Sequence, residues 1–335
     1  MNVAEGAPRI VAVEHGSAFW DDIGPVRACL GEPVPRIPPW FGYDEVGSQL
    51  FEQITELPTY YLTRVERGLL GRHSREIAEL IGDASLVELG SGSAKKTRLL
   101  LAACTAQRPT AYLPIDVSRE MLVASGTALR AALPGLFVTG IWGRYEAGLD
   151  WLRERDIGPA VIAFLGSNLG NTTPDERSAL LDHIAATARP GDGFLVSVDL
   201  DKPGPLLEAC YNDPPGRRAF AEFRLNYLTH LNRRFGADFR LDLFVPRAHY
   251  RSHGSVVEGH LFATEPHAVA VPGLGMTLDL GAGQSINVGF SAKFDHDEFV
   301  ADVVARGFTA QAEWVDPDWA YGIFLFRRTG PPSDG

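Results

Sequence analysis

Five short runs of consecutive apolar residues recur through the middle of the chain, and each is followed by a segment long enough for a helix. The runs cover residues 84–90, 110–116, 136–143, 159–166 and 193–200. Continuous rather than alternating apolar character is typical of strands that are covered on both faces. The pattern therefore predicts an α/β fold with a doubly wound, mostly parallel sheet.

The pattern changes after Leu200. Residues 204–235 are predicted to be helical. Four β-rich runs separated by Gly and Pro then indicate antiparallel strands, and they cover residues 239–250, 255–264, 267–273 and 283–294. A last helix and two last strands are expected to return the chain to the parallel sheet, and they cover residues 297–308, 310–317 and 321–328.

These two patterns divide the chain into domains. Residues 64–200 form the expected parallel domain, and residues 293–330 return to it. Residues 201–292 are an insertion, which we expect to form a second, α+β domain together with the mainly helical residues 1–63. Residues 331–335 are expected to be a terminal tail.

Composition narrows the choice of partner. The chain has 335 residues, of which 45% are apolar, and 42 acidic residues outnumber 31 basic ones. Without a cluster of Lys and Arg, neither nucleic acid nor an anionic membrane is an expected partner. No apolar stretch reaches the roughly 20 residues of a membrane helix, and no signal peptide is evident. We expect a cytoplasmic protein that binds a small molecule. The sequence does not determine the oligomeric state, and it is compatible with a monomer.

Neither the cysteines nor the histidines form a metal-binding motif. The three cysteines are far apart and include no Cys-x-x-Cys pair: Cys29, Cys104 and Cys210. This usage suits a reducing compartment and argues against a disulfide framework. Three of the nine histidines lie close together without zinc-site spacing: His249, His253 and His260. No metal is expected.

The first apolar run ends in a glycine turn, within the segment "SLVELGSGSAKKTRLL" (85–100). Gly90 and Gly92 let the backbone approach a ligand closely in a tight turn before the next helix, which is expected to begin near Ala94. A dinucleotide-binding motif would place a third glycine where Lys95 stands. A flavin or nicotinamide oxidoreductase is therefore the weaker alternative.

An acidic residue ends the next apolar run. Asp116 lies 26 positions after Gly90, where a carboxylate can accept both ribose hydroxyls of an adenosine. A glycine turn with a strand-end acid suits S-adenosylmethionine (SAM), which has a ribose but no phosphate. The carboxylate of its methionine part is within reach of Lys96. The structural alternative is a plain turn, a helix-capping Asp and a solvated lysine.

Polar and aromatic side chains gather in two further segments. In "AFLGSNLGN" (163–171), Ser167, Asn168 and Asn171 follow the fourth apolar run, at the edge where parallel sheets bind ligands. The alternative is that Asn171 and Thr172 cap the next helix. The other segment, "YDEVGSQLFEQITELPTYYLTR" (43–64), contains four aromatic residues that are equally typical of a core: Tyr43, Phe51, Tyr60 and Tyr61.

The segments "YDEVGSQLFEQITELPTYYLTR", "ELGSGSAKKTRLLL", "PIDVS", "FLGSNLGN" and "SAKF" occur in an order that resembles the histidine-specific SAM-dependent methyltransferase family. Its best-known members trimethylate the α-amine of histidine in the ergothioneine pathway. The resemblance implies a class I methyltransferase fold, SAM as methyl donor, S-adenosylhomocysteine as product and a free amino acid as substrate. It also implies cofactor contacts at Gly90, Ser91, Gly92, Lys96, Asp116, Arg144 and Tyr145.

The same resemblance implies how the amino acid is held. Its amino and carboxylate groups would be bound and aligned for catalysis by Tyr43, Tyr60 and Asn171, with Tyr211 as a further carboxylate contact. One departure concerns the cofactor: the family often has an acidic residue where this chain has Arg144.

A second departure concerns the substrate's ring. Family members that act on histidine bind the imidazole through a Glu two residues before Ser291, where this chain has Gly289, and a pocket position that is often Met is Gly259. Losing that carboxylate forfeits roughly 1.5–3 kcal/mol of binding to a polar ring. We therefore expect an aromatic amino acid larger than histidine, with tryptophan or another indole amino acid first. The alternatives are a histidine methyltransferase in which Glu258 replaces the lost Glu, and an inactive SAM-binding regulator.

Overall fold

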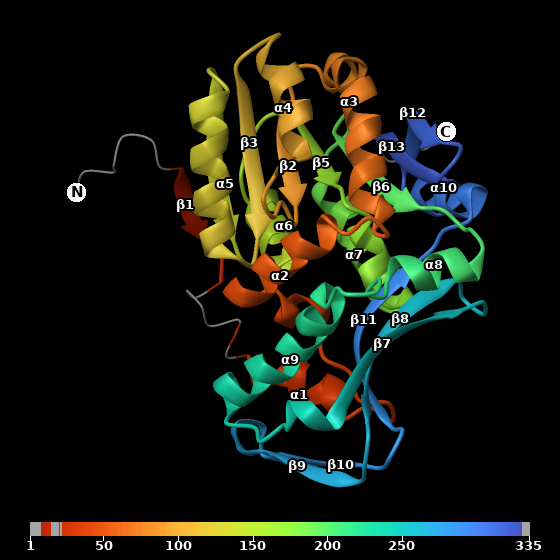
Figure 1. The fold of residues 1–335 in the computed structure, drawn as a ribbon. Coiled ribbons are helices and arrows are strands. Elements are labelled where there is room, and N and C mark those ends of the chain that lie inside the picture. Colours follow the sequence, from red (N-terminus) through yellow and green to blue (C-terminus); the bar gives the residue numbers. More distant parts are fainter. Residues whose placement is uncertain (1–7, 15–19, 21, 330–335) are drawn as a thin grey trace. The chain divides into compact units, whose positions relative to one another are not determined.

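The computed structural model describes residues 8–14, 20 and 22–329 and divides the chain into two compact units (Figure 1). Unit 1 comprises Met1–Gly16, Leu62–Asp201 and Phe294–Gly335. Unit 2 comprises Ser17–Tyr61 and Lys202–Lys293.

Unit 1 is built on an eight-stranded sheet in the order β1-β4-β3-β2-β5-β6-β13-β12. The first six strands in this order are parallel to one another, whereas β13 is antiparallel to both β6 and β12. The strands are β1 Arg9–Ala12, β2 Ser85–Leu89, β3 Thr110–Asp116, β4 Leu136–Trp142, β5 Ala160–Phe164, β6 Gly193–Asp199, β12 Phe308–Asp316 and β13 Tyr321–Arg328. The predicted doubly wound, mostly parallel fold is confirmed.

Helices cover the interior strands of this sheet. Every residue of β5 and β6 is buried, because both faces of these strands are covered. The helices whose residues lie mainly in unit 1 are α3 Tyr61–Ile81, α4 Thr97–Thr105, α5 Arg119–Ala132, α6 Tyr145–Arg153, α7 Pro174–Thr187 and α10 His296–Ala305, together with the 3-10 turn η3 Asn168–Asn171.

The N-terminal segment differs from the expected boundary. Residues 1–63 were predicted to be a mainly helical part of the second domain, but β1 pairs in parallel with β4, with Arg9 opposite Thr139. The strand has only four residues, and none of them is fully buried. The strand does contain an apolar run, residues 10–12, but the run is shorter than the five that predicted the other parallel strands.

Unit 2 combines helices with two small antiparallel sheets, ordered β11-β8-β7 and β10-β9. Its elements are α1 Ile23–Leu30, η2 Pro39–Gly42, α2 Glu45–Thr55, α8 Gly204–Cys210, α9 Ala219–Phe235, η4 Leu241–Leu243, β7 Phe244–Arg251, β8 Val256–Ala263, β9 His267–Val271, η5 Pro272–Leu274, β10 Met276–Leu280 and β11 Ser285–Ala292. The single helical stretch expected over 204–235 is thus two helices, since Pro214, Pro215 and Gly216 interrupt it. Strand β10 was not expected.

A buried carboxylate ties α2 to α9. Asp44 caps α2 by accepting a hydrogen bond from the backbone N–H of Gly47 at 2.8 Å. The same carboxylate accepts from Asn226 Nδ2 at 2.7 Å and from Arg233 Nη2 at 2.6 Å, both on α9. Because Tyr43 immediately precedes the cap, these bonds also fix its backbone within unit 2.

Candidate functional site

The candidate nucleoside-binding residues of unit 1 follow the carboxyl ends of adjacent parallel strands. From β2 the chain moves outward to β3 and β4, and then crosses back to β5 on the other side of β2. A reversal of this kind is the place where open α/β sheets bind ligands. The turns after β2, β4 and β5 and the last residue of β3 therefore share one edge of the sheet.

The turn after β2 has the left-handed backbone that its glycines allow. Gly90 and Gly92 have φ values of +70° and +50°. Asp116 Oδ2 accepts a hydrogen bond from Gly92 N at 2.8 Å, so the strand-end acid holds the turn. Between the glycines, Ser91 Oγ is buried near the Tyr112 hydroxyl and makes no hydrogen bond of good geometry with the described residues. A buried hydroxyl of this kind is a group that a bound polar ligand can satisfy.

Asp116 retains acceptor capacity for such a ligand. Its Oδ1 accepts from Ser118 N at 2.9 Å, which leaves about half of the lone pairs of an ionised carboxylate. Burial raises the pKa of Asp116 above its ordinary value, and the backbone bonds from Ser118 and Gly92 partly counteract that increase.

Tyr145 reaches back to the glycine turn. A Cβ atom at Gly90 would lie 2.6 Å from Tyr145 Oη and 3.3 Å from Asn168 Nδ2. The ring of Tyr145 also contacts Phe164 edge-on, with 5.3 Å between centroids. A side chain at position 90 would therefore have to displace the Tyr145 hydroxyl, and the adenine contact that the resemblance implies for Tyr145 stays a prediction.

Arg144 binds an acidic residue from the N-terminal segment. Its backbone N and its Nε each donate to the carboxylate of Glu14 at 2.8 Å. An acidic group thus lies beside position 144, where the family often has one, and it is bound to Arg144. Sequence reasoning missed Glu14, because 130 residues separate it from its partner.

Lys96 is paired with a second residue that the sequence analysis missed, Glu66 on α3. The Lys96 ammonium donates to Glu66 Oε2. Glu66 is fully buried, and its Oε1 accepts from Gly166 N at 2.7 Å and from Ser197 Oγ at 2.5 Å. The pair links α3 to the ends of β5 and β6, while the ammonium keeps further N–H donors. The sequence could have singled out Glu66, because this residue interrupts an apolar helical stripe. The stripe is formed by Leu62, Val65, Leu69 and Leu70.

Glu88, in β2 just before the turn, is buried beside Tyr112 and Thr97. It accepts hydrogen bonds from both hydroxyls. Burial raises its pKa from 4.5 to about 7, although these two bonds oppose the increase. In the pH range between those values the folded protein keeps a proton that the unfolded chain has lost. Stability therefore falls as the pH rises through this range, by about 3 kcal/mol.

We expect Glu88→Gln to remove much of this pH dependence. The free energy of unfolding, measured by urea denaturation at pH 5 and pH 8, should differ less in the variant than in the natural protein. Glu79→Gln, which changes an exposed carboxyl group paired with Arg75, is the control. An unchanged difference in Glu88→Gln would show that this carboxyl group is not the cause.

Asn171 lies at the end of η3 and does not cap the following helix. Helix α7 is capped by Thr173, whose side chain and that of Glu176 form a reciprocal capping box. The alternative that Asn171 and Thr172 are the caps is therefore wrong. Asn171 Nδ2 donates to Asn168 Oδ1 at 3.4 Å, and both belong to unit 1.

The predicted substrate tyrosines belong to unit 2 and contact the aromatic residues of α9. Tyr43 meets Phe223 with 5.4 Å between ring centroids, and Tyr60 meets Phe220 at 5.9 Å. Tyr60 also contacts Tyr211 edge-on at 5.9 Å. Helix α9 thus brings together three tyrosines that are far apart in the sequence.

Tyr211 is joined to the "SAKF" segment by hydrogen bonds. Its hydroxyl lies 2.6 Å from Ser291 Oγ, and Lys293 Nζ donates to both oxygens at 2.9 Å. Lys293, at 5% exposure, is buried. These bonds position Tyr211 against β11, and Lys293 is a residue of this cluster that the sequence analysis did not name.

A row without bulky side chains crosses the β11-β8-β7 sheet. Gly289 of β11 pairs with Gly259 of β8, which pairs with Ala248 of β7. A Cβ atom at Gly289 would meet nothing within 4 Å, whereas one at Gly259 would lie 3.1 Å from Arg224 Nε. The two missing side chains are therefore not equivalent: Gly289 borders open space, and Gly259 is covered by Arg224.

Glu258 lies on the other face of this sheet. Successive strand residues point to opposite faces, so Glu258 faces away from the glycine row. There its carboxylate binds Arg251 Nε at 2.5 Å and His260 Nε2 at 3.1 Å. Glu258 is not placed to replace a carboxylate missing at Gly289.

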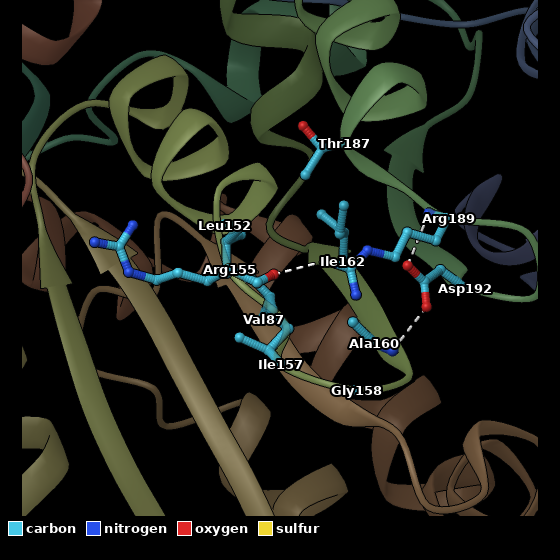
Figure 2. Close-up of a pocket in the computed structure, with 10 residues that line it drawn as sticks. All are labelled: Val87, Leu152, Arg155, Ile157, Gly158, Ala160, Ile162, Thr187, Arg189 and Asp192. Carbon is cyan, nitrogen blue, oxygen red and sulfur yellow. Dashed lines mark hydrogen bonds between the residues drawn. The ribbon is translucent and has the colours of Figure 1, made fainter.

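A small cavity in unit 1 is lined by residues that include Ala160, Arg189 and Asp192 (Figure 2). Its volume is about 20 Å³, enough for one water molecule. Asp192 closes it by accepting hydrogen bonds from Ala160 N and Arg189 N, both at 2.8 Å. Because Ala160 begins β5 and Asp192 directly precedes β6, the cavity is at the amino ends of these strands and is too small for a nucleoside.

Within the described residues, no group of three or more His, Cys, Asp or Glu side chains could hold a metal ion. Over the same residues, no helix has the length and apolar character needed to cross a bilayer.

With its glycine turn and strand-end acid at the switch point of a doubly wound sheet, unit 1 has the fold of a class I SAM-dependent methyltransferase. The profile of the family described as "Histidine-specific methyltransferase, SAM-dependent" matches residues 22–328, and the chain belongs to this family. The protein is thus a SAM-dependent N-methyltransferase.

Relatives with different substrates are similar to this chain. A histidine N-alpha-methyltransferase from Mycolicibacterium smegmatis is 37% identical over 304 residues, which cover 90% of this chain and 94% of that protein. An L-tryptophan methyltransferase from Psilocybe serbica is 26% identical over 318 residues, covering 87% of each chain. Among solved structures, a SAM-dependent methyltransferase from Clostridium acetobutylicum has a TM-score of 0.46 and 10% identity, and the match covers 84% of this chain and 99% of that one.

Proposed function

We propose that this enzyme methylates the α-amino group of a free aromatic amino acid larger than histidine, with tryptophan or another indole amino acid first. The observation that carries the proposal is the open space beside Gly289, where family members that act on histidine have a glutamate. An imidazole would lose its charged partner there, whereas a larger and less polar ring would fill the space.

The residues of unit 1 fit SAM. The buried Ser91 hydroxyl makes no hydrogen bond of good geometry with the described residues, and Asp116 keeps free acceptor positions for ribose hydroxyls. The other proposed SAM contacts are Gly90, Gly92 and Lys96. The residues proposed to lie near its adenine are Arg144 and Tyr145. When bound, SAM supplies an electrophilic methyl group on a positively charged sulfur.

The amino acid's nitrogen must be unprotonated to attack. An α-amino group titrates near pH 8 in short peptides and higher in free amino acids, so a modest preference of the site for the neutral amine is required. We propose that Tyr43, Tyr60 and Asn171 hold and orient this amine, and that partial desolvation favours its neutral form without a dedicated base. Tyr211 is proposed to contact the carboxylate of the substrate, and Ser291 to lie beside its ring. Rotation about the Cα–N bond presents the amine again, which allows one to three methyl groups.

Histidine is the alternative substrate, and the 37% identity to a histidine N-alpha-methyltransferase favours it. That alternative needs another group to bind the imidazole in place of the missing glutamate. Glu258 was the expected replacement, but it is on the opposite face of the sheet and is bound to Arg251 and His260. This placement supports the larger ring.

The test is to incubate the enzyme with SAM and each free amino acid, including indole derivatives, and to follow mass gains of one to three methyl groups. We expect the highest kcat/KM with an aromatic amino acid larger than histidine, and methylation at the α-nitrogen. Methylation of histidine alone would overturn the proposed substrate. Binding of SAM without methylation of any amino acid would instead indicate a regulator.

A further inference from the structure

Arg224 on α9 is a buried charge without an acidic partner. It is only 6% exposed, and no carboxylate oxygen of the described residues lies within 4.0 Å of its guanidinium nitrogens. Its Nη2 donates to the Tyr211 carbonyl oxygen at 2.6 Å, its one hydrogen bond to a described residue. A guanidinium has five N–H donors, so most of its hydrogen-bonding capacity is unused.

The charge of Arg224 persists despite burial. Burial lowers its pKa to about 10, and the nearby charge of Asp213 counteracts this effect. Asp213 itself is engaged elsewhere, because its oxygens accept from Phe220 N at 2.9 Å and Ala221 N at 2.8 Å at the start of α9. A buried charge without a close counterion is unfavourable, and an anionic ligand would relieve that cost.

The guanidinium lies beside the glycine row. Its Nε is 3.1 Å from the position of a Cβ atom at Gly259, the cross-strand neighbour of Gly289. It also stacks over Phe220, 5.0 Å from the ring centroid, and Phe220 contacts Tyr60. Arg224 further lines an open hollow of about 520 Å³ between α8, α9 and β7, whose other charged lining residues are Glu208, Asp213 and Arg247. The charge of Arg224 therefore lies beside Phe220, which contacts Tyr60, and beside Gly259, the neighbour of Gly289.

We propose that Arg224 binds an anionic group on the side chain of the substrate, so that, among aromatic amino acids larger than histidine, a ring that carries a carboxylate or a comparable acidic group is preferred over the same ring without it. This inference rests on the proposed function and refines its substrate class. A guanidinium recognises a carboxylate through two parallel hydrogen bonds, which neutral rings cannot supply.

The anion that Arg224 recognises is on the ring and not the α-carboxylate that all amino acids share. Arg224 meets Tyr211 at its backbone carbonyl oxygen, whereas the Tyr211 hydroxyl binds Ser291 and Lys293. The hydroxyl end is the one that the family resemblance implies for the α-carboxylate. Arg224 instead adjoins Gly259, a ring-pocket position.

The experiment compares two ring substituents of nearly equal size, in 4-carboxy-L-phenylalanine and 4-carbamoyl-L-phenylalanine. We expect the natural enzyme to prefer the carboxylate by at least tenfold in kcat/KM, and Arg224→Met to abolish this preference. Arg224→Lys should retain part of it. Arg251→Met, which removes a guanidinium on the opposite face of the sheet, should leave it unchanged. The melting temperature of each variant checks folding.

Three results would overturn the inference: equal kcat/KM for the two rings in the natural enzyme, a preference that survives in Arg224→Met, or an equal loss for all amino acids in Arg224→Met. The last result would place Arg224 at the α-carboxylate. If Arg224→Met does not fold, the test compares the natural enzyme with Arg224→Lys. An undiminished preference for the carboxylate ring in the lysine variant would contradict bidentate recognition by Arg224. Absence of methylation for every amino acid would be a failure of the proposed function itself.

Discussion

Gly90→Ala is expected to reduce SAM affinity at least tenfold while leaving the protein folded. The added methyl group would lie 2.6 Å from Tyr145 Oη, so the tyrosine must leave the turn and the proposed adenosine site with it. The left-handed backbone, with φ +70°, adds roughly 1–2 kcal/mol of strain for a residue with a Cβ atom. Isothermal titration calorimetry with SAM measures the affinity.

Gly82→Ala is the matched control for this variant. Gly82 has a similar φ of +63°, but a Cβ atom there would meet nothing within 4 Å. It should therefore show a comparable loss of stability and no change in SAM affinity. Normal SAM binding by Gly90→Ala, or an equal loss of binding in both variants, would contradict the assignment of the turn to the cofactor.

Gly289→Glu is expected to lower kcat/KM for tryptophan and to raise that for histidine. The new side chain would enter the space beside Gly289 and offer a carboxylate to an imidazole, a charge-assisted bond of about 1.5–3 kcal/mol, or roughly tenfold to a hundredfold. Because Arg224 adjoins the paired Gly259, it would compete for that carboxylate. The double variant Gly289→Glu with Arg224→Met should therefore show the larger gain with histidine.

Gly289→Ala separates the carboxylate from the backbone effect. The φ of Gly289 is +157°, which L side chains rarely adopt, so both variants share this strain. Steady-state kinetics with both amino acids should show the shift toward histidine only in the glutamate variant. The same specificity in both variants would mean that position 289 does not contact the ring.

The features that the sequence predicted are those that depend on local pattern. Apolar runs covered on both faces predicted β2 to β6, and the last residue of such a run, Asp116, lies at the binding edge for the same reason. Strand β1 was missed although residues 10–12 are apolar, because the run is short and its pairing with β4, like that of Glu14 with Arg144, joins distant segments.

Residues that act through tertiary pairing were also missed. In the sequence, Arg224 is typical of a polar position in an amphipathic helix. Only the packing of α9 against β8 shows that it covers Gly259. The position of Glu258 was predictable in principle, because adjacent strand residues face opposite sides once Gly259 is assigned to the pocket. The proposed replacement of the lost glutamate by Glu258 overlooked this alternation.

A direct competition between tryptophan and histidine tests the central claim. Equal concentrations of the two amino acids are mixed with enzyme and SAM carrying a ¹³C-labelled methyl group, and NMR identifies which α-nitrogen receives the label. We predict that the indole amino acid receives most of it, in proportion to its higher kcat/KM. Label found mainly on histidine would contradict the proposal that the space beside Gly289 selects a larger ring.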